Sequence, residues 1–313
     1  MNIIDLHENA WQTLQARRDR LPHALLLLGQ KGLGKYQLAR AFAKGLLCEA
    51  PLADGQSCGH CLACNWFAQG NHPDFRLLQP EAMGEEGESE DGKKKPSQQI
   101  TIDQIRALDE FFNVGTHRGG LRIIVVYPTE AMNRSTANSL LKTLEEPSPN
   151  TLFLMVSSEP MRLLPTIRSR CQVVPIPIPS PQRATQVLLE AGITDADRWL
   201  ALAGGAPVLA MEMASTGQDA WLTQLTNQLG SGKRIDPLGS AVAIDKAIKD
   251  SKGKLLLKQV VEAFQKWLVD LSLARNGIPV RYFLAQERTI SGLADMIPPA
   301  QLIHAYRAAI SHR

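Results

Sequence analysis

One stretch of this 313-residue sequence has the residue types and spacing of a phosphate-binding loop. The residues that define it are Gly29, Gly32, Gly34, Lys35 and Tyr36. Glycines let backbone N–H groups close around phosphate oxygens, and the lysine reaches the β- and γ-phosphates of a nucleotide. An apolar run precedes the loop and predicts a buried strand, and helical spacing follows it. The alternative is a glycine-rich turn that only joins strand to helix.

The metal-binding part of a nucleotide site is altered at two places in this sequence. The loop ends in Tyr36, where nucleotide hydrolases carry a Ser or Thr whose hydroxyl holds Mg²⁺. A second buried strand, expected at residues 122–127, ends in Tyr127 and Pro128 instead of the acids that support the metal and the attacking water. Glu130 lies two residues farther on, out of register for that role. We therefore expect weak or absent ATP binding and no intrinsic ATPase activity.

Four of the five cysteines form a second group of residues that could do chemistry, at Cys48, Cys58, Cys61 and Cys64. Thiolates at this spacing suit a tetrahedral Zn²⁺ ion with Zn–S distances of ~2.3 Å, because each C-x2-C step turns two sulfurs toward one ion. Four cysteines leave no coordination position for a substrate, so we predict a structural zinc site. An iron–sulfur cluster and a redox thiol pair are the alternatives.

Composition bounds the class of protein. The net charge of +3 is too small to indicate a nucleic-acid-binding protein by itself, and 44% hydrophobic residues support ordinary cores. No apolar run approaches the roughly 20 residues of a membrane span, and the polar N-terminus predicts no signal peptide. We expect a cytoplasmic protein without membrane contact, in which clustered cysteines bind metal.

The remaining sequence predicts the elements that position these residues. A charged stretch at residues 81–99 predicts a solvated loop. Beyond it, the sequence predicts a helix that stops at Pro147 and a third buried strand at residues 151–156. Four prolines at residues 173–181 predict a linker that leaves the first domain, and helical periodicity dominates beyond residue 215. The fold class is therefore α/β with a parallel sheet, followed by helical regions.

Three segments together carry a family resemblance: the run at residues 138–147, the strand at residues 152–156, and Ser169-Arg170-Cys171. They resemble the clamp-loader branch of the AAA+ family over roughly residues 21–174, and the resemblance is mainly architectural beyond that. It implies an AAA+ P-loop domain at residues 1–178, which includes the module of four cysteines at residues 48–64. It also implies a small helical lid domain at residues 179–213 and an all-helical oligomerisation (collar) domain at residues 214–313.

The resemblance also implies a function. In this family the arginine of the Ser-Arg-Cys motif is an arginine finger for the ATP of a neighbouring subunit, and Arg170 is the matching residue. The chain would then belong to the clamp loader of the DNA polymerase III holoenzyme, which loads the sliding clamp onto primed DNA. Its partners would be tau/gamma-like ATPase subunits and the clamp-opening delta subunit. For Arg170 the alternative is an ion pair that stabilises the fold.

Two other functions remain as alternatives. One is a self-sufficient AAA+ ATPase with a non-standard metal site, because Gly34 and Lys35 are both present. The other is a zinc-bearing DNA-binding adaptor, which the near-neutral charge and the lack of interleaved basic and aromatic residues disfavour.

Overall fold

The structure is a computed structural model that describes residues 2–84, 96–113, 120–216, 219–251 and 255–311. The described chain divides into two compact units, residues 2–178 and residues 179–313. Most of the predicted solvated loop, residues 85–95, lies outside the described residues, and its first residues form a single 3-10 turn at Glu81–Met83.

The first unit is built on one five-stranded sheet. Its strand order is β2-β3-β4-β1-β5, and every neighbouring pair is parallel. The strands are β1 (Ala24–Leu28), β2 (Phe75–Leu78), β3 (Arg122–Val126), β4 (Thr151–Ser157) and β5 (Gln172–Pro175). Because all strands run the same way, the carboxyl ends of β1, β3 and β4 meet at one edge, where ligands bind in open α/β sheets. The predicted α/β class with a parallel sheet is confirmed.

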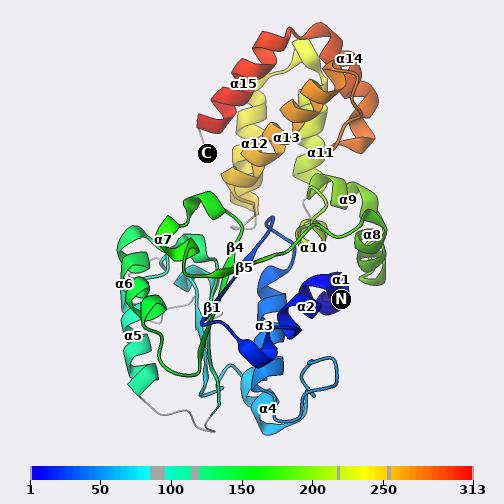
Figure 1. Cartoon of the computed structure of the whole chain (residues 1–313). Helices are drawn as coiled ribbons and strands as arrows, with labels where there is room; N and C mark the ends of the chain where they lie inside the picture. Colours follow the sequence, from blue (N-terminus) through cyan, green and yellow to red (C-terminus); the bar gives the residue numbers. More distant parts are fainter. Residues whose placement is uncertain (1, 85–95, 114–119, 217–218, 252–254, 312–313) are drawn as a thin grey trace. The chain divides into compact units, whose positions relative to one another are not determined.

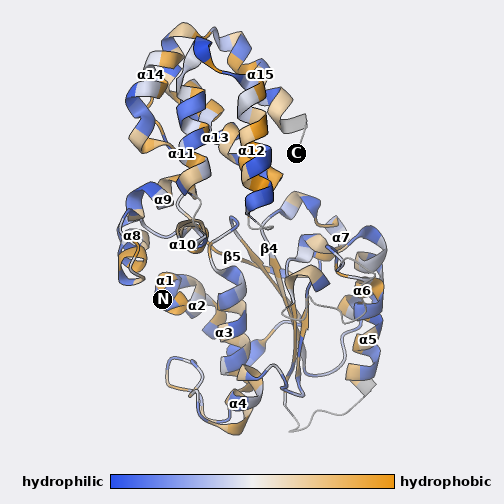
Figure 2. Cartoon of the chain, turned by 180° about the vertical axis from the view of Figure 1, so that it is seen from behind, coloured by the Kyte–Doolittle hydropathy of each residue, from blue (hydrophilic) through white to orange (hydrophobic). Residues whose placement is uncertain are grey.

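Helices cover both faces of this sheet (Figure 1). One face packs against α5 (Ile102–Asn113), α6 (Arg134–Glu145) and α7 (Pro165–Arg168). The other face lies against α2 (Glu8–Gln15) and α3 (Lys35–Leu47), and the short helices α1 (Ile3–Leu6) and α4 (Leu62–Ala68) contact α3. Every residue of β3 and β4 is buried, which explains the apolar runs at residues 123–126 and 152–156. Figure 2 shows the strands mainly in hydrophobic colours and the covering helices in both colours.

The sheet has two edge strands that the sequence pattern did not predict. β5 lies within the proline-rich stretch that was expected to be a linker, and this expectation is wrong for residues 173–175. Proline is tolerated there because β5 pairs on one side only, so its missing N–H breaks no inner ladder. β2 has four residues and sits at the opposite edge, too short to give a clear periodic signal.

The second unit is helical throughout its described residues. Its helices are α8 (Pro181–Glu190), α9 (Ala196–Leu202), α10 (Pro207–Ser215), α11 (Asp219–Gly230), α12 (Pro237–Asp250), α13 (Leu257–Arg275), α14 (Glu287–Met296) and α15 (Pro299–Ser311). In α13, Val260, Trp267, Leu268 and Leu271 are buried, whereas Leu257 at its start is exposed. Among the described helices of the whole chain, none combines the length and apolarity that membrane crossing requires.

One buried acid fixes a loop of this helical unit. Asp270 of α13 is fully buried, and its carboxylate accepts hydrogen bonds from three successive backbone N–H groups. These donors belong to Arg281 (2.8 Å), Tyr282 (3.0 and 3.2 Å) and Phe283 (2.8 Å). The charge is therefore compensated by backbone dipoles, and the segment before α14 is held to the middle of α13.

Candidate functional site

The glycine loop connects the carboxyl end of β1 to α3, as its sequence predicts. Gly32 and Gly34 have positive φ angles of 80° and 83°, a conformation that side chains with a Cβ rarely adopt. Gly34 is also the residue before the first turn of α3, which begins at Lys35. Gly29 lies where a Cβ would collide with the carbonyl oxygen of Ile176. The three glycines thus meet steric requirements of the fold itself.

Lys35 closes the loop on itself. Its side chain is buried, and its Nζ donates to the carbonyl oxygen of Gln30 at 2.6 Å and to Oγ of Ser158 at 2.9 Å. Burial lowers the pKa of Lys35 to about 8, and the negative charge of Glu130 opposes this shift. The ammonium that would contact phosphate oxygens is therefore held by the loop and by the end of β4.

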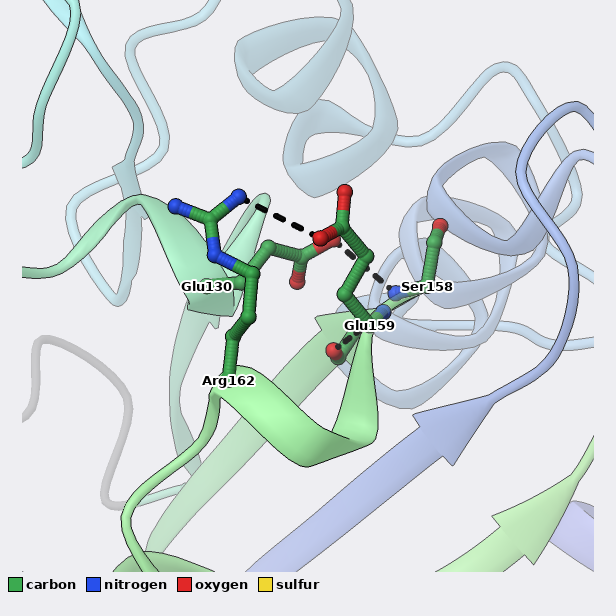
Figure 3. Close-up of polar contacts among 5 residues, drawn as sticks. Glu130, Ser158, Glu159 and Arg162 are labelled. Carbon is green, nitrogen blue, oxygen red and sulfur yellow. Dashed lines mark hydrogen bonds and ion pairs between the residues drawn. The ribbon is translucent and has the colours of Figure 1, made fainter. Parts of the chain in front are cut away.

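Glu130 and Ser158 extend this network along the edge of the sheet. Glu130 Oε1 accepts a hydrogen bond from the backbone N–H of Ser158 at 3.0 Å (Figure 3). The same picture shows Arg162 pointing to Glu159. The distance from Arg162 Nη1 to Glu159 Oε2 is 3.3 Å. Glu130 follows β3, Ser158 follows β4, and Lys35 follows the β1 loop, so three adjacent strand ends contribute one residue each. Glu130, which the sequence places out of register for activating water, therefore uses its carboxylate to cap the end of β4.

Two tyrosines occupy positions at which nucleotide hydrolases carry the residues that support Mg²⁺. The rings of Tyr36 and Tyr127 are stacked, with centroids 4.6 Å apart and an interplanar angle of 12°. The guanidinium of Arg40 lies 5.8 Å from the Tyr36 ring centroid and 5.6 Å from that of Phe67. Aromatic stacking stabilises such a pair by about 0.5–1.5 kcal/mol beyond area burial. The altered loop and the altered strand end are therefore in direct contact with each other.

His7 holds the loop from the N-terminal side. Its buried Nε2 lies 2.6 Å from the carbonyl oxygen of Leu33, and because a carbonyl only accepts, Nε2 carries the proton. Burial lowers the pKa of His7; the Leu33 carbonyl opposes this shift and Lys35 adds to it. Sequence reasoning missed this contact, since a histidine 26 residues before its partner has no local pattern.

The four clustered cysteines converge on one point. Their sulfur atoms all lie within 4.8 Å of one another, and the group could hold a metal ion. Cys48 follows α3, Cys58 lies in the connecting loop, Cys61 caps α4, and Cys64 lies in its first turn. Three of the Sγ–Sγ distances are 3.6 Å (Cys48–Cys64), 3.9 Å (Cys48–Cys61) and 4.0 Å (Cys58–Cys64). Zn–S bonds of ~2.3 Å in a tetrahedron would place sulfurs about 3.8 Å apart, so the donor set fits.

The pKa shifts of these four thiols are also consistent with a site that binds a cation. Burial raises the pKa of Cys64 to about 12, and burial raises that of Cys48 as well. At Cys61 burial acts in the same upward direction, but backbone N–H groups of Glu49 and Cys64 outweigh it and lower the pKa to about 6. The pKa of Cys58 is lowered, first by the N–H of His60. Two sulfurs therefore ionise readily, and the other two need a nearby positive charge to do so.

Arg170 lies just beyond α7, in a separate group of contacts. Its Nη2 is 2.5 Å from Oε1 of Glu145 at the end of α6. Its Nη1 donates to the carbonyl oxygen of Thr166 at 2.9 Å and lies 3.4 Å from Oγ of Ser169. The Arg170 side chain is 32% exposed, and the neighbouring Arg168 is exposed. The ion pair considered as the alternative for Arg170 is thus present, together with accessible guanidinium surface.

Comparison with solved structures finds a DNA polymerase III gamma subunit-related protein from Thermotoga maritima. It is 15% identical with a TM-score of 0.42, and the match covers 96% of this chain and 97% of that protein. A RuvB variant from Thermotoga maritima is 14% identical with a TM-score of 0.41, over 93% of this chain and 86% of that protein. Similarity at this level supports no inference about this chain.

Sequence comparison is more informative than these fold matches. The family model described as "DNA polymerase III, delta subunit" matches residues 6–180. The Pseudomonas aeruginosa DNA polymerase III subunit delta' is 34% identical over 299 residues, which cover 94% of this chain and 82% of that protein. The Escherichia coli delta' subunit is 34% identical over 194 residues, covering 61% of this chain and 54% of that protein. A Salmonella typhimurium subunit tau is 32% identical over 152 residues, covering 49% of this chain and 21% of that protein.

These matches extend over the sheet, the glycine loop, the cysteine group and Arg170, and the Pseudomonas aeruginosa match continues through most of the helical unit. They confirm the predicted relationship to bacterial DNA polymerase III subunits. The chain therefore belongs to the DNA polymerase III subunit delta' family.

Proposed function

We propose that this chain is a cytoplasmic subunit of the DNA polymerase III clamp loader that does not hydrolyse ATP itself. It acts as a rigid partner of tau/gamma-like ATPase subunits and of the clamp-opening delta subunit. The assembled complex loads the sliding clamp onto primed DNA. The family membership and the subunit names of the relatives support this role.

The observation that carries the proposal is the contact between Tyr36 and Tyr127. A P-loop hydrolase needs a small hydroxyl at the first position and an acid at the second, so that both can support Mg²⁺. Here two stacked phenol rings take these positions, and Lys35 is bonded to its own loop. A nucleotide would have to displace these contacts and would still lack its metal ligands, so ATP binding is weak or absent.

Arg170 supplies chemistry to a neighbouring subunit. A guanidinium is always charged and can hydrogen-bond two phosphate oxygens as charge shifts during hydrolysis. The Arg170 side chain is only partly covered, and its described contacts lie with residues of α6 and the α7 segment. We assign it as an arginine finger that acts in trans on the ATP of a tau/gamma-like subunit.

The ion that the four cysteines hold is structural Zn²⁺. Cys48, Cys58, Cys61 and Cys64 would each supply one thiolate, which fills a tetrahedral shell and leaves no position for substrate. None of the five cysteines forms a disulfide in the structure, so the four thiols of the cluster are available to a metal ion. We also propose that the chain has three domains. They are an AAA+ domain at residues 1–178, a helical lid at residues 179–213 and a helical collar at residues 214–313.

The proposal is tested by measuring ATP hydrolysis in two settings. The purified chain with Mg-ATP should show no turnover above that of its Lys35→Ala variant. In a clamp loader reconstituted with its other subunits, Arg170→Ala should leave assembly unchanged and lower DNA-stimulated hydrolysis and clamp loading. A finger in trans contributes ~10³–10⁵ to the rate at its own site, but the loss for a ring with several sites is smaller.

Arg168→Ala is the matched control, because Arg168 is an exposed arginine two residues away. It should retain clamp loading within the scatter of the unmodified complex. Turnover by the isolated chain that Lys35→Ala abolishes would favour the self-sufficient ATPase instead. Unchanged loading by the Arg170→Ala complex would make Arg170 a structural residue.

A further inference from the structure

Within its own chain, Arg170 forms an ion pair with Glu145. Glu145 is the last residue of α6, and its Oε1 lies 2.5 Å from Nη2 of Arg170. The two residues are far apart in the sequence and meet because α6 and α7 pack against each other. Both side chains are partly exposed, at 48% for Glu145 and 32% for Arg170. The contact therefore lies at the surface, where a neighbouring molecule could reach the arginine.

Helix stability does not explain an acid at this place. The carboxyl end of a helix carries a partial negative charge, so an acid in the last turn is unfavourable there. Helix α6 nevertheless ends in Glu145, and Glu146 follows as its C-cap residue. A basic residue would suit the position better if it served only the helix. The guanidinium of Arg170 supplies the opposite charge that this helix end lacks.

The contacts fix the guanidinium without using all of its donors. Thr166 and Ser169 engage Nη1, and Glu145 engages Nη2. An arginine has five N–H donors in a planar fork, so the described contacts leave two of them for another anion. A flexible arginine loses side-chain entropy when it binds phosphate, and this loss is smaller when the side chain is already held in place.

We propose that Glu145 is a positioning residue for Arg170, which holds the guanidinium in the orientation that contacts the phosphates of a neighbouring subunit's ATP. This inference rests on the proposed function of Arg170 in trans. In this role Glu145 needs no contact with the nucleotide or with the attacking water, because it acts only through Arg170. Removing its charge should therefore weaken the finger without abolishing it.

The test is the Glu145→Gln variant in the reconstituted clamp loader, assayed for DNA-stimulated ATP hydrolysis. We expect kcat to fall about two- to fivefold, which is the size of effect that exposed ion pairs produce. The KM for ATP should stay unchanged, because the nucleotide is bound by the neighbouring subunit. Glu146→Gln is the matched control, since it removes the same charge one residue away at the same helix end. It should leave kcat unchanged.

A double variant separates positioning from a general structural effect. If Glu145 acts through Arg170, Glu145→Gln should cause no further loss of kcat in an Arg170→Ala complex. An additional loss in that background, an equal loss in Glu146→Gln, or a gain in kcat from Glu145→Gln alone would each overturn the inference. If Arg170→Ala alone retains the full rate, the proposed function itself fails. If only Glu145→Gln retains it, the function stands and the positioning role is wrong.

Discussion

The buried lysine is the most informative single residue of the glycine loop. Lys35 keeps two hydrogen-bond partners, Gln30 and Ser158, that hold its ammonium away from water. Its lowered pKa of about 8 arises from burial, which the charge of Glu130 only partly offsets. The lysine thus makes the stability of the protein depend on pH, even in the absence of any ligand.

We predict that Lys35→Met removes this dependence. The folded state releases the Lys35 proton near pH 8, whereas the unfolded chain keeps it until about pH 10.5. Between these values the unfolded state binds more protons, so the contribution of Lys35 to stability rises with pH. From about pH 7.5 to about pH 9.5 the unmodified protein should gain about 1–2 kcal/mol of unfolding free energy relative to Lys35→Met.

Urea unfolding at both pH values measures this difference. Lys31→Met provides the control, because Lys31 is an exposed lysine of the same loop. Lys31→Met keeps the buried Lys35, so its unfolding free energy should still rise over this interval relative to Lys35→Met. A difference between the Lys35→Met and unmodified proteins that is the same at both pH values would contradict the assigned environment of the ammonium.

Among the elements, the cysteine module between α3 and α4 has little core of its own. Within residues 51–60 of its loop, Gly55 alone is buried. A hydrogen bond ties the loop to α2, from Nε1 of Trp11 to the carbonyl oxygen of Asp54 at 2.9 Å. Because the loop buries so little apolar surface, its order should depend on the ion.

We predict that the purified chain contains about one Zn²⁺ and that a strong chelator exposes residues 48–64 to proteases while the sheet stays folded. Cys61→Ser should lower the zinc content and reproduce the protease sensitivity. Cys171→Ser should do neither, since Cys171 lies 3.4 Å from the sulfur of Met155 and outside the cluster. Iron in elemental analysis, or a folded protein free of metal, would count against this site.

Local spacing explains what the sequence could reveal about these elements. The glycine loop, the cysteine group and strands β1, β3 and β4 were predictable because each depends on residues close together in the chain. The bond between Lys35 and Ser158 spans 123 positions and depends on which strands are neighbours. The β5 edge was missed for a related reason, because its prolines are acceptable only at an unpaired side of the sheet. The roles of the site residues remain predictions until the variants are assayed.

At the scale of the whole molecule, the division into two compact units has an energetic consequence. We predict that Asp270→Ala destabilises the helical unit by about 2–4 kcal/mol, because three backbone N–H groups lose a charged acceptor in a buried place. The N-terminal unit should keep its zinc and its amide protection. Hydrogen exchange, resolved by segment, measures both effects in one experiment.

Asp245→Ala is the matched control on the neighbouring helix α12. Asp245 is an exposed acid that pairs with Lys249 one turn away, and its loss should change hydrogen exchange in the helical unit far less than Asp270→Ala does. Equal acceleration of exchange in residues 2–178 after Asp270→Ala would show that the two units unfold together.

The close approach of Gly29 to Ile176 bears on the ancestry of the molecule. The Gly29 Cα faces the carbonyl oxygen of Ile176, and the Ile176 N–H donates to the carbonyl oxygen of Leu28 at 2.7 Å. Any larger residue at position 29 would push β1 and the chain beyond β5 apart. Selection for folding alone would therefore retain this glycine in a lineage that had given up nucleotide hydrolysis. In such a protein the glycine reflects the packing of the fold, and its presence says little about whether the loop still binds a nucleotide.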